Sequence, residues 1–214
     1  MKRTFVVVFF MVFILWTTAA LAADTYKWTG VDFGIQGSWA VGKTDWSYQN
    51  NGRTVDHRID GWTAGGFVGY NYQFPFNLVL GVETDLNYAS IKGFDTCPNP
   101  SWTGHSEIDW VGSTRLRVGY AIYRFLPYIA IGPAYGRVNV FTKNSAGVEF
   151  GEKKTYLGVS PSIGLDFAIT DNFFARAEYD YIYLGKNEMA VDFGNVVDTK
   201  VAFSNFKLAI GFKF

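Results

Sequence analysis

Apolar and polar residues alternate one by one along most of this chain. The alternation is clearest at the C-terminus, where residues 205–214 read NFKLAIGFKF and every even-numbered position is apolar. A period of two places successive side chains on opposite faces of a β-strand, whereas a helix gives a period near 3.6. The segment therefore predicts a strand with one apolar face and one polar or small face.

Seven further segments alternate in the same way, so the sequence predicts eight strands in all. The other seven span residues 30–41, 62–73, 78–88, 108–120, 127–141, 157–167 and 173–183. In the fourth of the eight strands, residues 108–120, we expect the apolar face to include Ile108 and Leu116. Regular alternation over so many segments predicts an all-β protein.

The fifth segment, residues 127–141, is less regular than the others because both of its faces carry apolar residues. Tyr128 alternates with Ile129, and Arg137 lies on the Ile129 face. We therefore expect the face with Ile129 to be the polar one. Pro133 falls inside the segment and cannot donate a ladder hydrogen bond, which predicts a β-bulge there.

The connections between these segments also alternate in length. Long polar connections cover residues 42–60, 90–107, 142–154 and 184–199, and short ones cover 74–77, 121–125 and 168–172. Four long loops on one side and three short turns on the other predict an eight-stranded antiparallel up-and-down transmembrane β-barrel. We expect strands of about 10–13 residues, extracellular long loops and periplasmic termini.

The polar faces carry six acids and six bases: Glu83, Asp85, Asp109, Arg115, Arg117, Arg137, Asp166, Arg176, Glu178, Asp180, Lys207 and Lys213. A soluble ligand-binding barrel would line its interior with apolar residues, so this polarity favours a membrane barrel with a charged lumen. Eight strands leave room only for packed side chains, and buried charges must pair. We expect an ion-pair network that fills the lumen, with a narrow ion path as the alternative.

The N-terminal residues form a separate unit. Two basic residues precede the unbroken apolar run 5–16, and the small-residue sequence Ala-Leu-Ala follows at 20–22. This order is typical of a secretory signal peptide. We therefore expect residues 1–22 to be removed and residues 23–214 to form the outer-membrane barrel domain.

Few side chains in the sequence suit catalysis or metal binding. The only cysteine, Cys97, cannot form an internal disulfide, and 19 basic residues balance 19 acidic ones, so nothing indicates a nucleic-acid partner. The two histidines, His57 and His105, fall in predicted loops. We expect no catalytic residues and no metal site, with a lipid-modifying barrel enzyme as an alternative. The alternative for the histidines is that they ligate heme iron.

Specific stretches of sequence are spread over the chain from residue 28 to residue 214. They are WTGVDFGIQGSW (28–39), GGFVGYNYQF (65–74), LGVETDL (80–86), DWVGSTRLRVGYA (109–121), LPYIAIGPAYG (126–136), FFARAEYDY (173–181) and FKLAIGFKF (206–214). In these stretches the chain resembles the alphaproteobacterial outer-membrane surface-antigen family, whose small immunogenic barrels include hemin-binding, porin-like members.

The resemblance implies a barrel in the outer membrane of a Gram-negative bacterium, and it brings no catalytic residues to transfer. We expect a non-enzymatic surface protein that contributes to envelope integrity and meets host or extracellular ligands through its loops. The alternative is a hemin-binding or small-solute porin-like protein. For the protein itself we also expect outer-membrane lipid and the barrel-assembly machinery as partners, and we expect that machinery to read the terminal aromatic residue, Phe214.

Overall fold

The computed structural model of the chain describes residues 25–48, 54–96, 102–144, 149–191 and 195–214. None of these residues forms a helix long and apolar enough to cross a membrane. The predicted signal peptide, residues 1–22, and Cys97 lie outside the described residues. The strands are β1 (Gly30–Tyr48), β2 (Thr54–Gln73), β3 (Leu78–Thr96), β4 (Trp102–Tyr120), β5 (Phe125–Ile131), β6 (Pro133–Asn144), β7 (Glu149–Val159), β8 (Ser162–Ala168), β9 (Phe173–Val191) and β10 (Asn195–Lys213).

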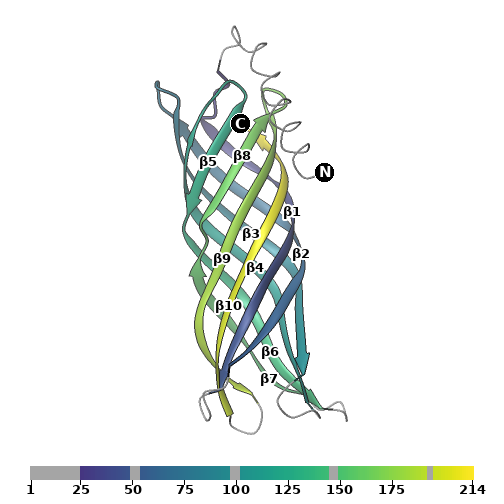
Figure 1. The fold of residues 1–214 in the computed structure, drawn as a ribbon. Coiled ribbons are helices and arrows are strands. Elements are labelled where there is room, and N and C mark those ends of the chain that lie inside the picture. The colour runs from purple at the N-terminus through teal and green to yellow at the C-terminus, as the bar shows by residue number, and fades with distance from the viewer. Residues whose placement is uncertain (1–24, 49–53, 97–101, 145–148, 192–194) are drawn as a thin grey trace, which may run out of the picture.

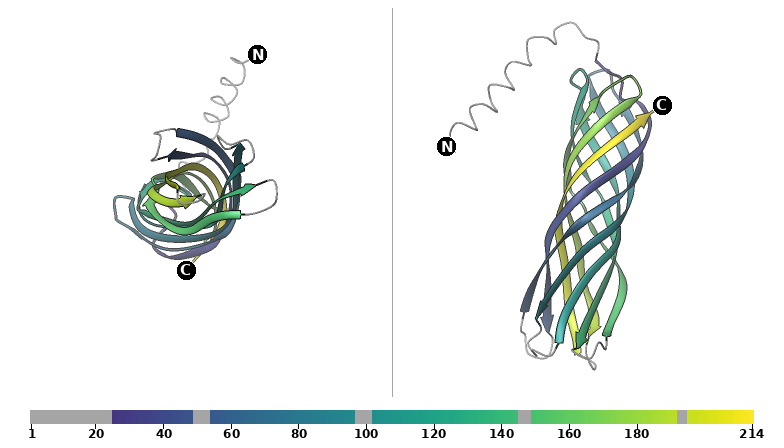
Figure 2. Two further views of the ribbon diagram at one scale, coloured as in Figure 1. Left: turned by 90° about the horizontal axis from the view of Figure 1, so that it is seen from below. Right: turned by 90° about the vertical axis from the view of Figure 1, so that its right-hand side faces the viewer.

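The strands form one antiparallel sheet that closes on itself (Figures 1 and 2). The first and last strands pair along their length, from Asp32 opposite Lys213 to Tyr48 opposite Val197. Every other pairing joins strands that follow one another around the ring. The predicted antiparallel up-and-down barrel is therefore confirmed.

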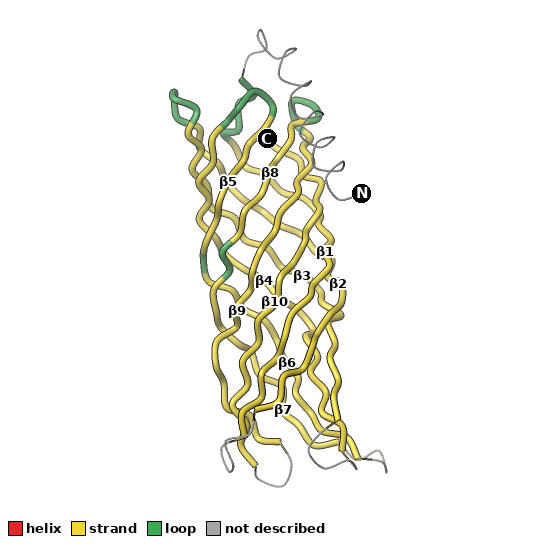
Figure 3. The backbone as a smooth tube through the Cα atoms, viewed as in Figure 1, coloured by secondary structure: helices red, strands yellow, loops and turns green. Residues whose placement is uncertain are grey.

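Ten strand elements make up an eight-stranded wall, because two of the strands are interrupted half-way. β5 and β6 are separated by Gly132, and β7 and β8 by Ser160 and Pro161; Figure 3 shows these breaks as loop segments within the wall. Pro133 and Pro161 each lack the N–H that a ladder requires.

The register is the same on both sides of the break at Gly132. Leu116 pairs with Ile131 and Ser113 with Ala134, so both strands advance by three residues across the break. No residue is inserted, and the β-bulge predicted at Pro133 is wrong. The missing proline hydrogen bonds interrupt the ladder without bending the strand out of register.

The two ends of the barrel differ. At one end, here called the terminal end, β10 finishes beside the start of β1, and residues 74–77, 121–124 and 169–172 connect the strands. These are the three short turns that the sequence predicts. The opposite end, here called the distal end, is where β1, β3, β6 and β9 finish.

The prediction of four long loops, which would lie at the distal end, is wrong. Most residues of 42–60, 90–107, 142–154 and 184–199 belong to strands, which leaves only 49–53, 97–101, 145–148 and 192–194 outside the described residues. Six unbroken strands run for 19 or 20 residues instead of the expected 10–13. Their distal parts carry charge on the outer face, and this hides the apolar–polar alternation.

The outer face of the wall is an apolar band between two aromatic girdles. Aliphatic residues such as Ile35, Leu116 and Leu208 are 67–72% exposed in its middle. Phe33, Phe173 and Phe212 gather toward the terminal end, and ring contacts join them. The distal girdle contains Trp39, Trp62, Tyr88, Trp110, Tyr135, Tyr179 and Phe206. An apolar band bounded by such girdles is typical of a barrel that spans lipid.

Two predicted face assignments are wrong. The register of β4 shifts between Ile108 and Trp110, and this irregularity turns Ile108 into the lumen, where it is 3% exposed. On β5, Tyr128 is 4% exposed and points inward, whereas Ile129 is 61% exposed. The two faces of the fifth strand are therefore the reverse of those expected. Both faces carry large apolar residues, and such residues suit contact with lipid as well as packing in a lumen.

We expect Leu116→Arg to destabilise the barrel by about 2–4 kcal/mol, because it places a charge in the middle of the apolar band. Urea unfolding in lipid vesicles, followed by the heat-dependent gel mobility of the folded barrel, measures this change. Thr155→Arg is the matched control, since Thr155 is exposed on the outer face of β7 beyond the distal girdle. Equal stability of the two variants would mean that the apolar band does not face lipid.

Candidate functional site: the barrel lumen

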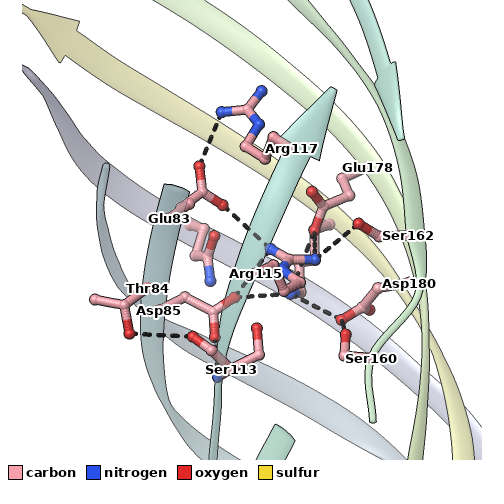
Figure 4. A network of polar contacts seen from close by, with 12 residues as sticks. Glu83, Thr84, Asp85, Ser113, Arg115, Arg117, Ser160, Ser162, Glu178 and Asp180 are labelled. Atoms are coloured by element: carbon pink, nitrogen blue, oxygen red, sulfur yellow. Dashed lines mark hydrogen bonds and ion pairs between the residues drawn. The ribbon is translucent and has the colours of Figure 1, made fainter. Parts of the chain in front are cut away.

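Arg115 on β4 is at the centre of a buried polar network that fills the middle of the lumen (Figure 4). Its guanidinium lies 3.1 Å from Glu83 and 3.3 Å from Asp85, both on β3. It also donates to Glu178 on β9 at 2.8 Å and to Ser162 on β8 at 3.0 Å. Because β4 and β9 are not neighbours in the wall, Arg115 ties opposite sides of the barrel together.

A second group of charges lies nearer the terminal end. Arg117 on β4 contacts Glu83 at 3.0 Å and Asp166 on β8 at 2.7 Å. Arg176 on β9 donates through Nε to Asp166 Oδ1 at 2.7 Å and through Nη1 to Glu83. Glu83 thus receives hydrogen bonds from three arginines, two on β4 and one across the lumen on β9.

Lys207 on β10 completes the network on the distal side. Its ammonium lies 2.9 Å from Asp180, 3.1 Å from Asp85 and 3.5 Å from Glu178. Tyr128 on β5 donates its hydroxyl proton to Glu178 at 2.6 Å, and the Arg117 guanidinium stacks over its ring at 3.8 Å. Charge-assisted hydrogen bonds of this kind are the strongest that side chains form.

An apolar layer lies on each side of this network. The distal layer is formed by Ala40, Ile59, Ala89, Ile91, Ile108, Val111, Ala134, Val138, Tyr156, Ile182, Leu184, Val201 and Phe203. The terminal layer is formed by Trp28, Phe67, Val79, Ala121, Leu126, Ala168, Phe174 and Ala209. Apolar side chains packed across a narrow lumen exclude the water that ions would need to pass.

The residues that precede β1 fold back into the terminal layer. Trp28 is 1% exposed and its backbone N–H donates to Gln73 Oε1 at 2.8 Å. Burial and the Asp171 carboxylate raise the pKa of Tyr26 to about 12, so its phenol stays protonated and donates to the Asp171 carbonyl at 2.7 Å. Trp28 therefore closes the terminal end of the lumen from within the same chain.

Nine of the twelve charged residues predicted for the lumen lie in it, each at most 5% exposed: Glu83, Asp85, Arg115, Arg117, Asp166, Arg176, Glu178, Asp180 and Lys207. The other three do not. Asp109 pairs on the surface with Lys153 at 3.5 Å, Arg137 is exposed, and Lys213 lies at the terminal rim over the Tyr26 ring. The sequence placed Asp109 in the lumen because it could not show the irregularity in β4. It placed Arg137 there because it assigned the faces of the fifth strand the wrong way round.

Asp32 on β1 is a lumen acid that the predicted set lacks, although the alternation of its strand places it on the polar face. It is 2% exposed, accepts a hydrogen bond from Asn71, and its second oxygen has no protein partner. With Asp32 included, the described lumen holds six acids and four bases, rather than six of each. Asp32 is thus the lumen carboxylate with no ion-pair partner among the described residues.

The histidines do not lie in loops, contrary to expectation. His57 belongs to β2, opposite Thr44, and His105 belongs to β4, where its ring stacks on Phe141 at 4.9 Å. In the described part of the chain, no group of three or more His, Cys, Asp or Glu side chains could hold a metal ion. Heme ligation by His57 and His105 stays a prediction.

We expect Asp166→Asn to destabilise the barrel by about 3–5 kcal/mol, because it removes one of the two carboxylates that Arg117 and Arg176 share and leaves only Glu83 to both. Asp32→Asn is the matched variant. It keeps a carbonyl acceptor for Asn71 and removes a charge that has no ion-pair partner, so its cost should stay under about 1 kcal/mol. Urea unfolding in vesicles compares the two, and an equal loss of stability would contradict the assigned pairing.

Comparison with known proteins agrees with this architecture. The family model of the outer membrane protein beta-barrel domain matches residues 9–214. The 31 kDa outer-membrane immunogenic protein of Brucella melitensis is 31% identical over 209 residues, which cover 91% of this chain and 87% of the relative. The 22 kDa outer membrane protein of Rhizobium leguminosarum bv. viciae is 32% identical over 188 residues, 88% of this chain and 79% of the relative.

Among solved structures, the outer membrane protein OprG from Pseudomonas aeruginosa is 13% identical, with a TM-score of 0.49 over 90% of this chain and 99% of that chain. The family match and the two alphaproteobacterial relatives confirm the resemblance seen in the sequence motifs. The chain therefore belongs to the outer membrane protein beta-barrel domain family, as a surface barrel of the Gram-negative outer membrane.

Proposed function

We propose that this barrel is a non-enzymatic, non-conducting surface protein that stabilises the envelope and presents its distal end to the outside. The observation that carries the proposal is the filling of the lumen. Nine charged side chains pair across the middle, and an apolar layer closes each side. Such an interior supports a rigid wall better than a solute path.

The proposed orientation places the distal end outside and both termini in the periplasm. The short turns and both ends of the barrel sequence share the terminal end, as in bacterial outer-membrane barrels. The outer face beyond the distal girdle carries exposed charges, among them Lys43, Arg58 and Lys92. The surface available to external ligands is therefore a rim of extended strands rather than a set of long loops.

We expect the purified protein to show no discrete conductance steps in a planar lipid bilayer, with a general porin as the positive control. The physical reason is that ions would have to cross two apolar layers. Steps that change their ion selectivity in a Glu83→Gln variant would assign the current to the lumen. That result would replace the proposal with a porin-like function.

We also propose that Phe214 acts in assembly rather than in the stability of the finished barrel. Its side chain is 70% exposed and contacts only the rings of Phe33 and Phe212 among the described aromatic residues. We expect Phe214→Ser to lower the folded yield in the outer membrane of cells by several-fold. Refolding of the same variant into pure lipid vesicles should proceed nearly as for the unchanged protein.

Comparison of the two yields separates recognition by assembly machinery from folding energetics. Phe212→Ser is the control, because Phe212 contacts three other rings and its loss should lower both yields. If Phe214→Ser assembled normally in cells, the terminal residue would have no signalling role.

A further inference from the structure

The seam between β10 and β1 has an unusual outer surface beyond the distal girdle. Trp39 on β1 lies opposite Phe206 on β10 in the girdle itself. The next outward pairs toward the distal end are Val41 with Ser204 and Lys43 with Ala202. Small residues on β10 thus replace the large rings of the girdle, and the surface is hollowed there.

The hollow is a groove of about 310 Å³ whose walls come from three strands. Tyr181 on β9 lies on one side, Val41 and Lys43 on the other, and Ala202 and Ser204 form the floor. A second groove of about 380 Å³ lies on the same seam within the apolar band, lined by Ile35, Gly37, Leu208 and Ile210. In the register of the seam, the girdle pair Trp39 and Phe206 lies between the two grooves. With the distal end taken as the top, the first groove is here called the upper groove and the second the lower groove.

Two cations lie side by side at the edge of the upper groove, Lys43 in its wall and Arg58 on the neighbouring strand. Lys43 and Arg58 are directly opposite each other on β1 and β2, both are exposed, and neither forms an ion pair with any described residue. Like charges placed directly opposite destabilise an antiparallel pair. By register, three acids share this face: Asp60 lies directly opposite Lys92 on β3, and Asp45 and Asp56 lie opposite each other one outward pair further toward the distal end. An anion that bridges Lys43 and Arg58 would remove their repulsion.

We propose that the β10–β1 seam binds an anionic glycolipid of the outer leaflet, with an acyl chain in the lower groove and a headgroup phosphate on Lys43 and Arg58. The upper groove supplies the hydroxyl groups of Ser204 and Tyr181 for the sugar. Arginine and lysine are the side chains that bind phosphate most strongly. The inference rests on the proposed orientation, in which the distal end lies outside.

The distance of the two cations from the aromatic girdle favours a lipid whose headgroup extends far from the acyl chains. Lys43 is four residues beyond Trp39, which corresponds to about 10 Å along the axis of a barrel whose strands tilt by about 40°. The headgroup layer of an ordinary phospholipid is only about 5–8 Å thick. A phosphorylated sugar headgroup, as in the lipid A anchor of lipopolysaccharide, extends further and reaches both cations.

Native mass spectrometry of the purified full barrel with bisphosphorylated lipid A tests the proposal. We expect a saturable complex that weakens roughly tenfold or more in Lys43→Gln/Arg58→Gln, because two charge-assisted contacts are lost. Filling the groove with Ala202→Leu should weaken binding without a change in charge. Lys153→Gln, on β7 away from the seam and paired with Asp109, is the control and should bind normally.

Gel mobility before and after heating verifies that each variant is folded. Equal lipid A binding by the double variant and the unchanged protein would overturn the inference while leaving the proposed function intact. Preferential binding of phosphatidylglycerol at the same cations would also overturn it. That second outcome would further count against the proposed orientation, since it would place the seam in a phospholipid leaflet.

Discussion

Closure of the sheet is the constraint on which the rest of this structure depends. A strand in lipid cannot leave its backbone N–H and C=O groups unpaired, so the last strand has to pair with the first. β10 and β1 meet this requirement along their whole length. Closure with eight strands makes the lumen narrow, and a narrow lumen has room for side chains but little for water.

The charge network follows from that narrow lumen. An isolated buried charge is costly, and truncating one member of a buried pair is strongly destabilising. Here Glu83, Arg115 and Arg176 join strands on opposite sides of the wall. The network therefore braces the barrel across its axis, while the wall hydrogen bonds hold it around its circumference. The apolar layers then separate these charges from water at both ends.

Strict alternation in the sequence is sufficient to predict the barrel and most of its lumen. Strands with one apolar and one charged face, such as the stretch of β9 from Arg176 to Asp180, have the orientation expected. Prediction failed where both faces are apolar, as at Tyr128 and Ile129, and where one irregularity turned Ile108 inward. Alternation cannot show such a local shift, because it depends on contacts with the neighbouring strands.

The distal parts of the strands were missed for a different reason. Beyond the girdle the outer face meets water or headgroups, so residues such as Lys43 and Arg58 replace apolar ones and the composition resembles that of a loop. The cations that carry the lipid inference thus lie in segments that the sequence assigned to loops. Their pairing across β1 and β2 became visible only with the register.

Water accessibility of the lumen tests the central claim of this account most directly. In a Cys97→Ser background, a single cysteine at Ser113, which is 1% exposed between the charges and the distal layer, reports on the interior. We expect Ser113→Cys to resist a charged, water-soluble thiol reagent in the folded barrel, while Thr155→Cys on the outer surface reacts fully. Rapid modification of Ser113→Cys in the folded protein would contradict a sealed lumen.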